Sequence, residues 1–414
     1  MPSASTNSPA QPASIRALVS VAVFGFASGL PLALTGSTLQ AWLTQTGTSV
    51  ETIGTLSLVG LPYLFKFLWA PLLDRYPLSR WSRRRGWLVL TQVLLVLLIS
   101  GLALSDPSAQ ALRIAVLALT LAVVSATQDI AVDAYRAEVL PPAQRGVGAG
   151  ISVAGYRLAM IVSGAGLLVA AEHFGFARGF QGIALLTSLL LLWTFMAPEP
   201  DLHTMNPRTL ADAYSSQLWT LAKIPGIAGF VALIVLYKLG DAFAGSLTMT
   251  FLLRGPGFSL TEIGTIYKAL GVGASIVGGV AGGWWMMRLG LFRALLWFGV
   301  LQAATNLGFL VLATVDKSLL AMSVVIALEN LSGGMGTSAL LALLMNLCDQ
   351  RYTATHFAVL SALASLARVL SGPLAGQVAT FGWVAFFTCS IVLSLPGLVV
   401  LVAIRDHIVA RDAR

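Results

Sequence analysis

The chain has 414 residues, of which 57% are hydrophobic and only 10% are charged, and its mean hydropathy is +0.84. Soluble domains carry about 25% charged residues, so this composition excludes a soluble globular protein and predicts a membrane protein. The formal net charge of +8 does not indicate a nucleic-acid partner, because the basic residues gather between apolar segments.

Apolar segments of about 20 residues, the length that crosses a bilayer core, recur along the whole chain. They predict an all-α polytopic membrane protein with twelve transmembrane helices. We expect the spans at residues 17–43, 51–73, 87–105, 110–136, 146–171, 179–197, 225–252, 261–287, 291–313, 317–346, 353–378 and 381–403.

A long polar stretch after the sixth span divides the chain into two equal sets of spans. This layout is typical of the major facilitator fold, in which two pseudo-symmetric six-helix halves move about a site at mid-membrane. The predicted units are a disordered cytoplasmic tail at 1–15, an N-terminal bundle at 16–197, a cytoplasmic linker at 198–224, a C-terminal bundle at 225–404 and a cytoplasmic tail at 405–414.

Basic residues between the spans are distributed unequally. Only Arg113, Arg178, Arg254 and Lys317 fall on one side of the predicted topology, and the others fall on the opposite side. The positive-inside rule then places both termini in the cytoplasm, which requires an even number of spans.

Ten charged residues lie inside otherwise apolar spans, while spans three, six, nine and twelve carry none away from their ends. One charge at the bilayer centre costs roughly 2.5–3.5 kcal/mol, so these groups must face water, a ligand or each other. We therefore predict that the charge-free spans are peripheral and that the others enclose a polar cavity. The ten residues are Lys66, Asp129, Asp133, Arg136, Arg157, Lys238, Asp241, Lys268, Glu329 and Arg368.

Three carboxylates at depth are candidates for proton coupling: Asp129, Asp241 and Glu329. Asp129 shares a helix face with Asp133, four positions later, and two carboxylates on a dry face do not both ionise easily. Asp133 and Arg136 lie nearer the cytoplasmic end of the fourth span, where they fit a gate or a structural ion pair.

Lys238 and Asp241 stand three positions apart near the middle of the seventh span. Two interpretations stay open. The pair is an internal salt bridge that neutralises both groups, or it is a switch in which protonation of Asp241 frees Lys238 for an anionic substrate.

An excess of cations suits a substrate with carboxylates, because arginine offers them a planar fork of donors. Uncharged amides and hydroxyls bond sugar hydroxyls, and they equally bond backbone or allow close helix packing. The candidates for substrate binding are Lys66, Arg157, Lys238, Lys268, Arg368, Gln40 and Gln128.

The loop APLLDRYPLSRWSRRRG at residues 70–86 resembles the signature loop of major facilitator transporters. This resemblance implies that Asp74 and Arg75 belong to a gate that closes the cytoplasmic side. The same arginines also act as topology determinants under the positive-inside rule.

Several segments closely resemble the AmpG family of muropeptide permeases in peptidoglycan recycling. They include GFASGLPLALTGSTLQAW (25–42), SATQDIAVDAYRAEVLP (125–141), LIVLYKLGDAFAGSLT (233–248) and ALENLSGGMGTSALLALLMNLCD (327–349). The resemblance implies proton-driven import, across a bacterial inner membrane, of GlcNAc-1,6-anhydroMurNAc and its peptide forms. In some bacteria these imported muropeptides also signal β-lactamase induction.

The resemblance also implies roles for single residues. It carries a functional role onto Asp129 in the Thr-Gln-Asp-Ile motif, and then onto Lys238 and Asp241 in the Tyr-Lys-Leu-Gly-Asp motif. We expect a monomer that uses the proton-motive force and no other cofactor.

The alternatives are a transporter of another anionic solute, such as a coenzyme A thioester, or a membrane acyltransferase. The chain has no dense basic cluster for three phosphates and no histidine beside a catalytic acid, which disfavours both. Its two cysteines, Cys348 and Cys389, lie in apolar surroundings and predict neither a disulfide framework nor a metal site.

Overall fold

The structure is a computed structural model that describes residues 14–75, 78, 84–107, 109–141, 145–199, 223–347 and 353–412. Within these ranges the chain forms helices and no strand. Eleven helical segments of this described part are long and apolar enough to cross a membrane. The predicted all-α polytopic architecture is therefore confirmed.

The N-terminal half consists of long helices and one crossing made of short pieces. Its elements are α1 (Ile15–Thr35), α2 (Ser37–Gln45), α3 (Val50–Thr55), η1 (Leu56–Gly60), α4 (Leu61–Phe65), η2 (Lys66–Leu68), α5 (Ala70–Arg75), α6 (Arg84–Ala103), α7 (Ala111–Val139), α8 (Arg145–Ile161), η4 (Val162–Gly166), α9 (Leu167–Phe174) and α10 (Phe176–Met196).

The C-terminal half repeats this arrangement and ends in a short additional helix. Its elements are α12 (Ile227–Leu236), α13 (Leu239–Arg254), α14 (Leu260–Glu262), η5 (Ile263–Leu270), α15 (Gly271–Leu289), α16 (Leu291–Leu312), α17 (Leu319–Leu347), α18 (Thr353–Ala379), α19 (Trp383–Ala403) and α20 (Arg405–Asp412).

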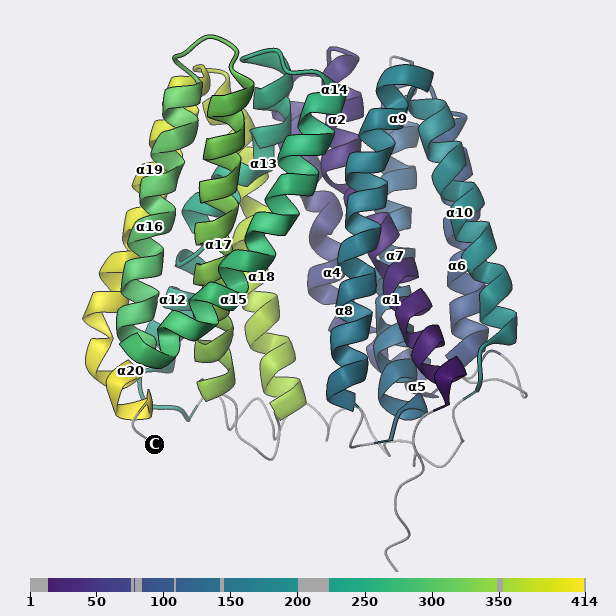
Figure 1. The fold of residues 1–414 in the computed structure, drawn as a ribbon, viewed down its shortest axis with the longest axis horizontal. Helices are drawn as coiled ribbons and strands as arrows, with labels where there is room; N and C mark the ends of the chain where they lie inside the picture. The colour runs from purple at the N-terminus through teal and green to yellow at the C-terminus, as the bar shows by residue number, and fades with distance from the viewer. Residues whose placement is uncertain are drawn as a thin grey trace, which may run out of the picture.

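The second predicted span, at 51–73, is not one continuous helix. It runs through α3, η1, α4, η2 and α5, where η1 and η2 are 3-10 turns, and Figure 1 shows α4 and α5 following one another across the bundle. Proline removes a backbone donor from a helix, and glycine weakens it, so Gly60, Pro62 and Pro71 account for the breaks. This crossing, added to the eleven long segments, gives the twelve predicted spans.

The charge-free spans lie at the edges of the molecule. Figure 1 shows α6 and α10 at one lateral edge and α16 and α19 at the other. Each of these helices packs mainly on helices of its own half, such as α6 on α10 and α16 on α19. The prediction that spans three, six, nine and twelve are peripheral is confirmed.

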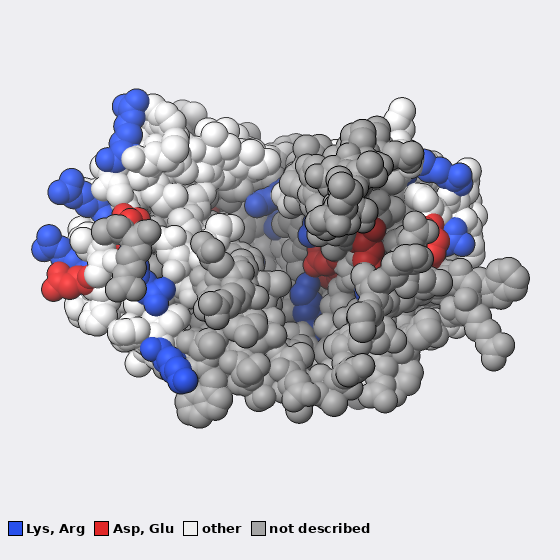
Figure 2. Space-filling view, turned by 90° about the horizontal axis from the view of Figure 1, so that it is seen from below, with Lys and Arg blue, Asp and Glu red and all other residues white. Residues whose placement is uncertain are grey.

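Among the described residues, the two halves pack on each other mainly on one side. The first helix begins and the last described helix ends on the same face, which we call the termini side. On the opposite side α2 packs on α13, α3 on α18, and α9 on α14. Seen from the termini side, basic and acidic side chains are visible near the middle of the molecule (Figure 2).

The apolar cores follow the same asymmetry. The largest cluster joins both halves and includes Leu39 and Phe251. A second cluster around Phe230 belongs to the C-terminal half alone, and a third around Tyr135 belongs to the N-terminal half alone. The halves therefore share a core on the side opposite the termini and separate towards the termini side.

The linker and the C-terminal tail are two segments predicted outside the helical bundles. Most of the linker at 198–224 lies outside the described residues. The predicted tail at 405–414 contains α20, in which Ile408 is fully buried and Asp412 Oδ2 accepts a hydrogen bond from Leu291 N at 3.0 Å. This helix therefore caps the start of α16, because a carboxylate satisfies the free N–H groups of a helix N-terminus.

Candidate functional site

The first charged pair of the site lies in the N-terminal half, where α1, η2 and α7 meet. The Nζ atom of Lys66 lies 3.7 Å from Oδ2 of Asp129. Ser28 of α1 donates its hydroxyl hydrogen to the other oxygen of the same carboxylate. Tyr63 and Tyr156 also interact electrostatically with Asp129. The irregular second span thus brings a lysine to the carboxylate that the sequence motif singled out.

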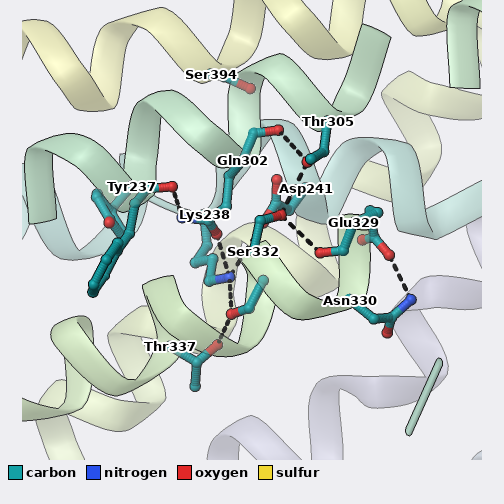
Figure 3. Close-up of polar contacts among 12 residues, drawn as sticks. Tyr237, Lys238, Asp241, Gln302, Thr305, Glu329, Asn330, Ser332, Thr337 and Ser394 are labelled. Carbon is teal, nitrogen blue, oxygen red and sulfur yellow. Dashed lines mark hydrogen bonds and ion pairs between the residues drawn. The ribbon is translucent and has the colours of Figure 1, made fainter. Parts of the chain in front are cut away.

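The second charged cluster lies in the C-terminal half, where α12 ends and α13 begins. Figure 3 shows the ammonium of Lys238 among the side chains of this cluster. It donates to Oδ2 of Asp241 at 3.2 Å, to the carbonyl of Gly333 at 2.9 Å, and to Oε1 of Gln302. An ammonium has three N–H donors, so all of them are used in this arrangement.

Glu329 of α17 borders this cluster without a cation of its own. Its Oε2 accepts a hydrogen bond from Asn330 Nδ2 at 2.7 Å, and it interacts electrostatically with Asp241 and Lys238. No described lysine or arginine lies within ion-pair distance of Glu329. The cluster therefore has two carboxylates and one ammonium.

Three cations of the predicted cavity form no ion pair with any described residue: Arg157, Lys268 and Arg368. The aliphatic part of Lys268 packs over Gly164 of the other half, and its ammonium lies 4.7 Å from the ring centroid of Tyr267. Arg157 and Arg368 come from different halves, yet both interact electrostatically with Tyr156. These two arginines therefore face the space between the halves.

The two amide candidates are placed differently from the cations. Gln40 is buried and donates from Nε2 to the carbonyl of Ser246 at 2.6 Å, so it links the two halves. Gln128 is fully buried and donates from Nε2 to the carbonyl of Ala27 at 3.0 Å, while its Oε1 has no partner among the described residues. Both amides are engaged with backbone in this conformation.

The candidate gating residues lie towards the termini side. Asp133 and Arg136 form an ion pair of 3.1 Å along α7, and the carboxylate is more than half exposed. Asp74 and Arg75 end α5, and their side chains lie outside the described part of the structure.

The sequence did not predict a second pair on this side, between Arg84 of α6 and Glu138 of α7. Arg84 is almost fully buried, so this pair fastens the two helices to each other.

Polar contacts between the halves close the side opposite the termini. Arg254 of α13 donates to the carbonyls of Thr44 and Thr48 at 2.8 and 2.7 Å. Glu172 at the end of α9 accepts a hydrogen bond from the backbone N–H of Thr261, at the start of α14. Arg254 thus places a positive charge near the C-terminal end of α2, and Glu172 places a negative charge at the N-terminal end of α14. Both placements are favoured by the helix dipole. Sequence reasoning missed both, because each depends on tertiary packing.

Metal binding has no candidate group in the described part of the chain, where no cluster of three or more His, Cys, Asp or Glu residues occurs. The charged residues that the sequence predicts for the cavity comprise three carboxylates and five cations. The carboxylates are Asp129, Asp241 and Glu329, and the cations are Lys66, Arg157, Lys238, Lys268 and Arg368.

Comparison with known proteins identifies the family of this chain. The sequence profile of the Major Facilitator Superfamily matches residues 18–371. The anhydromuropeptide permease of Escherichia coli K12 is 49% identical over 389 residues, covering 93% of this chain and 79% of the relative. The chain belongs to the AmpG family of this superfamily. A Rickettsia felis chain named transporter AmpG 4 is 32% identical over 406 residues, covering 94% of this chain and 97% of the relative.

Solved structures support the fold of this AmpG-family transporter. The nucleoside transporter NupG has a TM-score of 0.73 at 11% identity, covering 94% of this chain and 99% of that one. A D-xylose–proton symporter has a TM-score of 0.66 at 14% identity, covering 94% and 95%. At such low identity the likeness concerns the fold alone. The family and its relatives are named permeases and transporters, so the chain is a transporter and not an enzyme.

Proposed function

We propose that this AmpG-family transporter imports anhydromuropeptides, GlcNAc-1,6-anhydroMurNAc with or without peptide, from periplasm to cytoplasm by alternating access. The name of the 49% identical relative supports this substrate class. Proton flow drives the import, and no other cofactor takes part. The transporter acts as a monomer in the bacterial inner membrane, without a nucleic-acid partner.

The observation that carries the proposal is the charge between the halves. The residues that we propose for the cavity comprise five cations and three carboxylates, which leaves an excess of positive charge in the membrane interior. Such an excess is costly in a bilayer unless an anion neutralises it. Anhydromuropeptides carry carboxylates on the lactyl group or on the peptide, so they supply that negative charge.

The cations of the site fall into two groups, those without a carboxylate partner and those already in an ion pair. Arg157, Lys268 and Arg368 have no carboxylate partner among the described residues, so they are the first binding groups for a substrate carboxylate. Lys66 and Lys238 are already paired, with Asp129 and Asp241. Lys66 enters the substrate site when Asp129 takes up a proton. Gln40 contributes when movement of the halves releases its bond to Ser246, and Gln128 contributes its Oε1, which has no partner among the described residues.

Orientation follows from the positive-inside rule, which places both termini in the cytoplasm. The termini side, where the halves have separate apolar cores, then faces the cytoplasm, and the contacts of Arg254 and Glu172 close the periplasmic side. The conformation described is thus the one that releases substrate inside the cell. Asp74, Arg75, Asp133 and Arg136 belong to the gate that closes the cytoplasmic side in the opposite state.

Uptake of labelled GlcNAc-anhydroMurNAc, in cells that lack their own permease, tests the proposal. We expect expression of this chain to produce accumulation, an uncoupler to abolish it, and excess unlabelled anhydromuropeptide to compete where acetyl-coenzyme A does not. Arg368→Gln should raise KM about tenfold or more, because a charge-assisted hydrogen bond is lost. Arg178→Gln, an exposed arginine on peripheral α10, is the matched control. Absence of uptake by the unaltered chain would overturn the substrate assignment, and uptake that resists the uncoupler would overturn proton coupling.

A further inference from the structure

The peripheral helix α16 sends one neutral side chain into the charged cluster of the C-terminal half. Gln302 is 3% exposed, and its Oε1 accepts a hydrogen bond from the ammonium of Lys238 (Figure 3). Its Nε2 donates to the carbonyl of Phe298 at 3.1 Å, one turn earlier on the same helix. The amide is therefore held at both ends, with its oxygen towards the lysine.

The opposing helix α17 provides the space for this side chain. A Cβ atom added to Gly336 would lie 2.1 Å from Nε2 and 2.7 Å from Oε1 of Gln302, closer than real atoms approach. The carbonyl of Gly333, three residues earlier, accepts the neighbouring hydrogen bond from Lys238 at 2.9 Å. One glycine of α17 thus admits the amide, and another completes the coordination of the ammonium.

Two of the three acceptors of Lys238 are neutral. When Asp241 takes up a proton, its attraction for the ammonium falls, but the hydrogen bonds to Gln302 and Gly333 remain. Lys238 therefore stays in the cluster and is not released towards a substrate. Of the two interpretations of the Lys238–Asp241 pair, this arrangement favours the internal one.

We infer that Gln302 is a positioning residue that holds Lys238 beside Asp241 and so keeps Glu329 as the carboxylate of the cluster without a cation partner. The inference rests on the proposed proton-coupled function and adds a residue that decides which carboxylate of this cluster binds the proton. The charged or titratable groups that interact with Glu329 are Lys238, Asp241 of α13 and Tyr267 of η5. Because Glu329 lacks a cation, it is the group of this cluster that binds a proton, in addition to Asp129 of the other half.

The central variant is Gln302→Leu, which removes the neutral acceptor. Lys238 then has an unused donor and moves towards Glu329, whose ionised form a nearby cation favours. The pH of half-maximal uptake should therefore fall by about one unit. Gly336→Ala, which displaces the amide without removing it, should shift this pH in the same direction. The double variant should shift it no further than Gln302→Leu alone.

The matched control is Asn306→Leu. Asn306 is another fully buried amide of α16, and its Nδ2 lies 3.5 Å from Ser394 Oγ. Its loss should leave the pH midpoint unchanged even where it lowers the amount of folded protein. A uniform loss of uptake in Gln302→Leu, with an unaltered midpoint, would mean that Gln302 only supports packing and would overturn the inference.

A measurement without transport separates this inference from the proposed function. Infrared difference spectra of the purified protein in lipid detect the C=O band of protonated Glu329, which is assigned by its loss in Glu329→Gln. Its titration midpoint should fall in Gln302→Leu and stay constant in Asn306→Leu. Such a shift in a protein without coupled uptake would retain the positioning role and reject the proposed function. Coupled uptake with no shift would reject the positioning role alone.

Discussion

Asp129 is the residue whose replacement separates proton coupling from substrate movement. Asp129→Asn preserves the shape of the side chain but removes its ability to bind a proton, while Ser28 still has an oxygen to which it can donate. We expect accumulation to fall about tenfold or more, because this step needs the proton gradient. Exchange of labelled for unlabelled substrate should persist. Asp316→Asn, at an exposed loop position on the side opposite the termini, is the control, and full accumulation by Asp129→Asn would contradict the assignment.

Single residues also show what the sequence could reveal. Lys238 and Asp241 are three positions apart on one chain segment, so their contact was predictable from helical spacing. The Lys66–Asp129 pair was not, because it joins two spans whose packing the sequence pattern does not specify. Gln302 was missed because a search for charges in apolar spans passes over a neutral amide. A buried glutamine in a charge-free span was the one available signal.

Among the elements, the crossing of α3 and α18 depends on small residues. A Cβ atom on Gly54 would lie 2.4 Å from the carbonyl oxygen of Gly372 and 2.8 Å from the Cα of Gly376. Gly54→Ala should therefore push these helices apart and lower the maximal uptake rate about tenfold or more, since backbone atoms cannot yield as a flexible side chain can. Gly182→Ala, at a position of α10 with no neighbour within 4 Å, should leave uptake unchanged. Equal maximal uptake rates in Gly54→Ala and Gly182→Ala would show that transport tolerates separation of α3 from α18.

The positions of the spans were largely predictable from the sequence. Whether a span forms one unbroken helix was not. Apolar length located the spans, and the absence of internal charge identified the peripheral ones, because lipid excludes charge wherever a helix faces it. The second span was expected as one helix at 51–73. Its division into α3, η1, α4, η2 and α5 depends on how Gly60 and Pro62 pack against neighbouring helices, which composition does not specify.

At the scale of the whole molecule, two polar contacts hold the halves together opposite the termini. Arg254→Ala removes two hydrogen bonds from a charged donor, and Glu172→Ala removes one at a helix N-terminus. Charge-assisted hydrogen bonds contribute roughly 1.5–3 kcal/mol, so Arg254→Ala should raise the population open on this side about tenfold or more. Spin labels at Thr46→Cys and Thr380→Cys, in a chain with Ala at both native cysteines, should report a longer distance. The control Arg178→Ala should not change that distance. An unaltered distance in both Arg254→Ala and Glu172→Ala would show that these contacts do not hold the halves together.

The two 3-10 turns of the second span also change its length. A 3-10 turn rises about 2.0 Å per residue and an α-helix 1.5 Å. The five residues of η1 and the three of η2 therefore make this crossing about 4 Å longer than an α-helix of the same sequence. Its first piece touches α18, and its η2 turn begins with Lys66 beside Asp129. This extra length lies between the closed side and the Lys66–Asp129 pair. If the two 3-10 turns became α-helical, the span would shorten and would still cross the membrane.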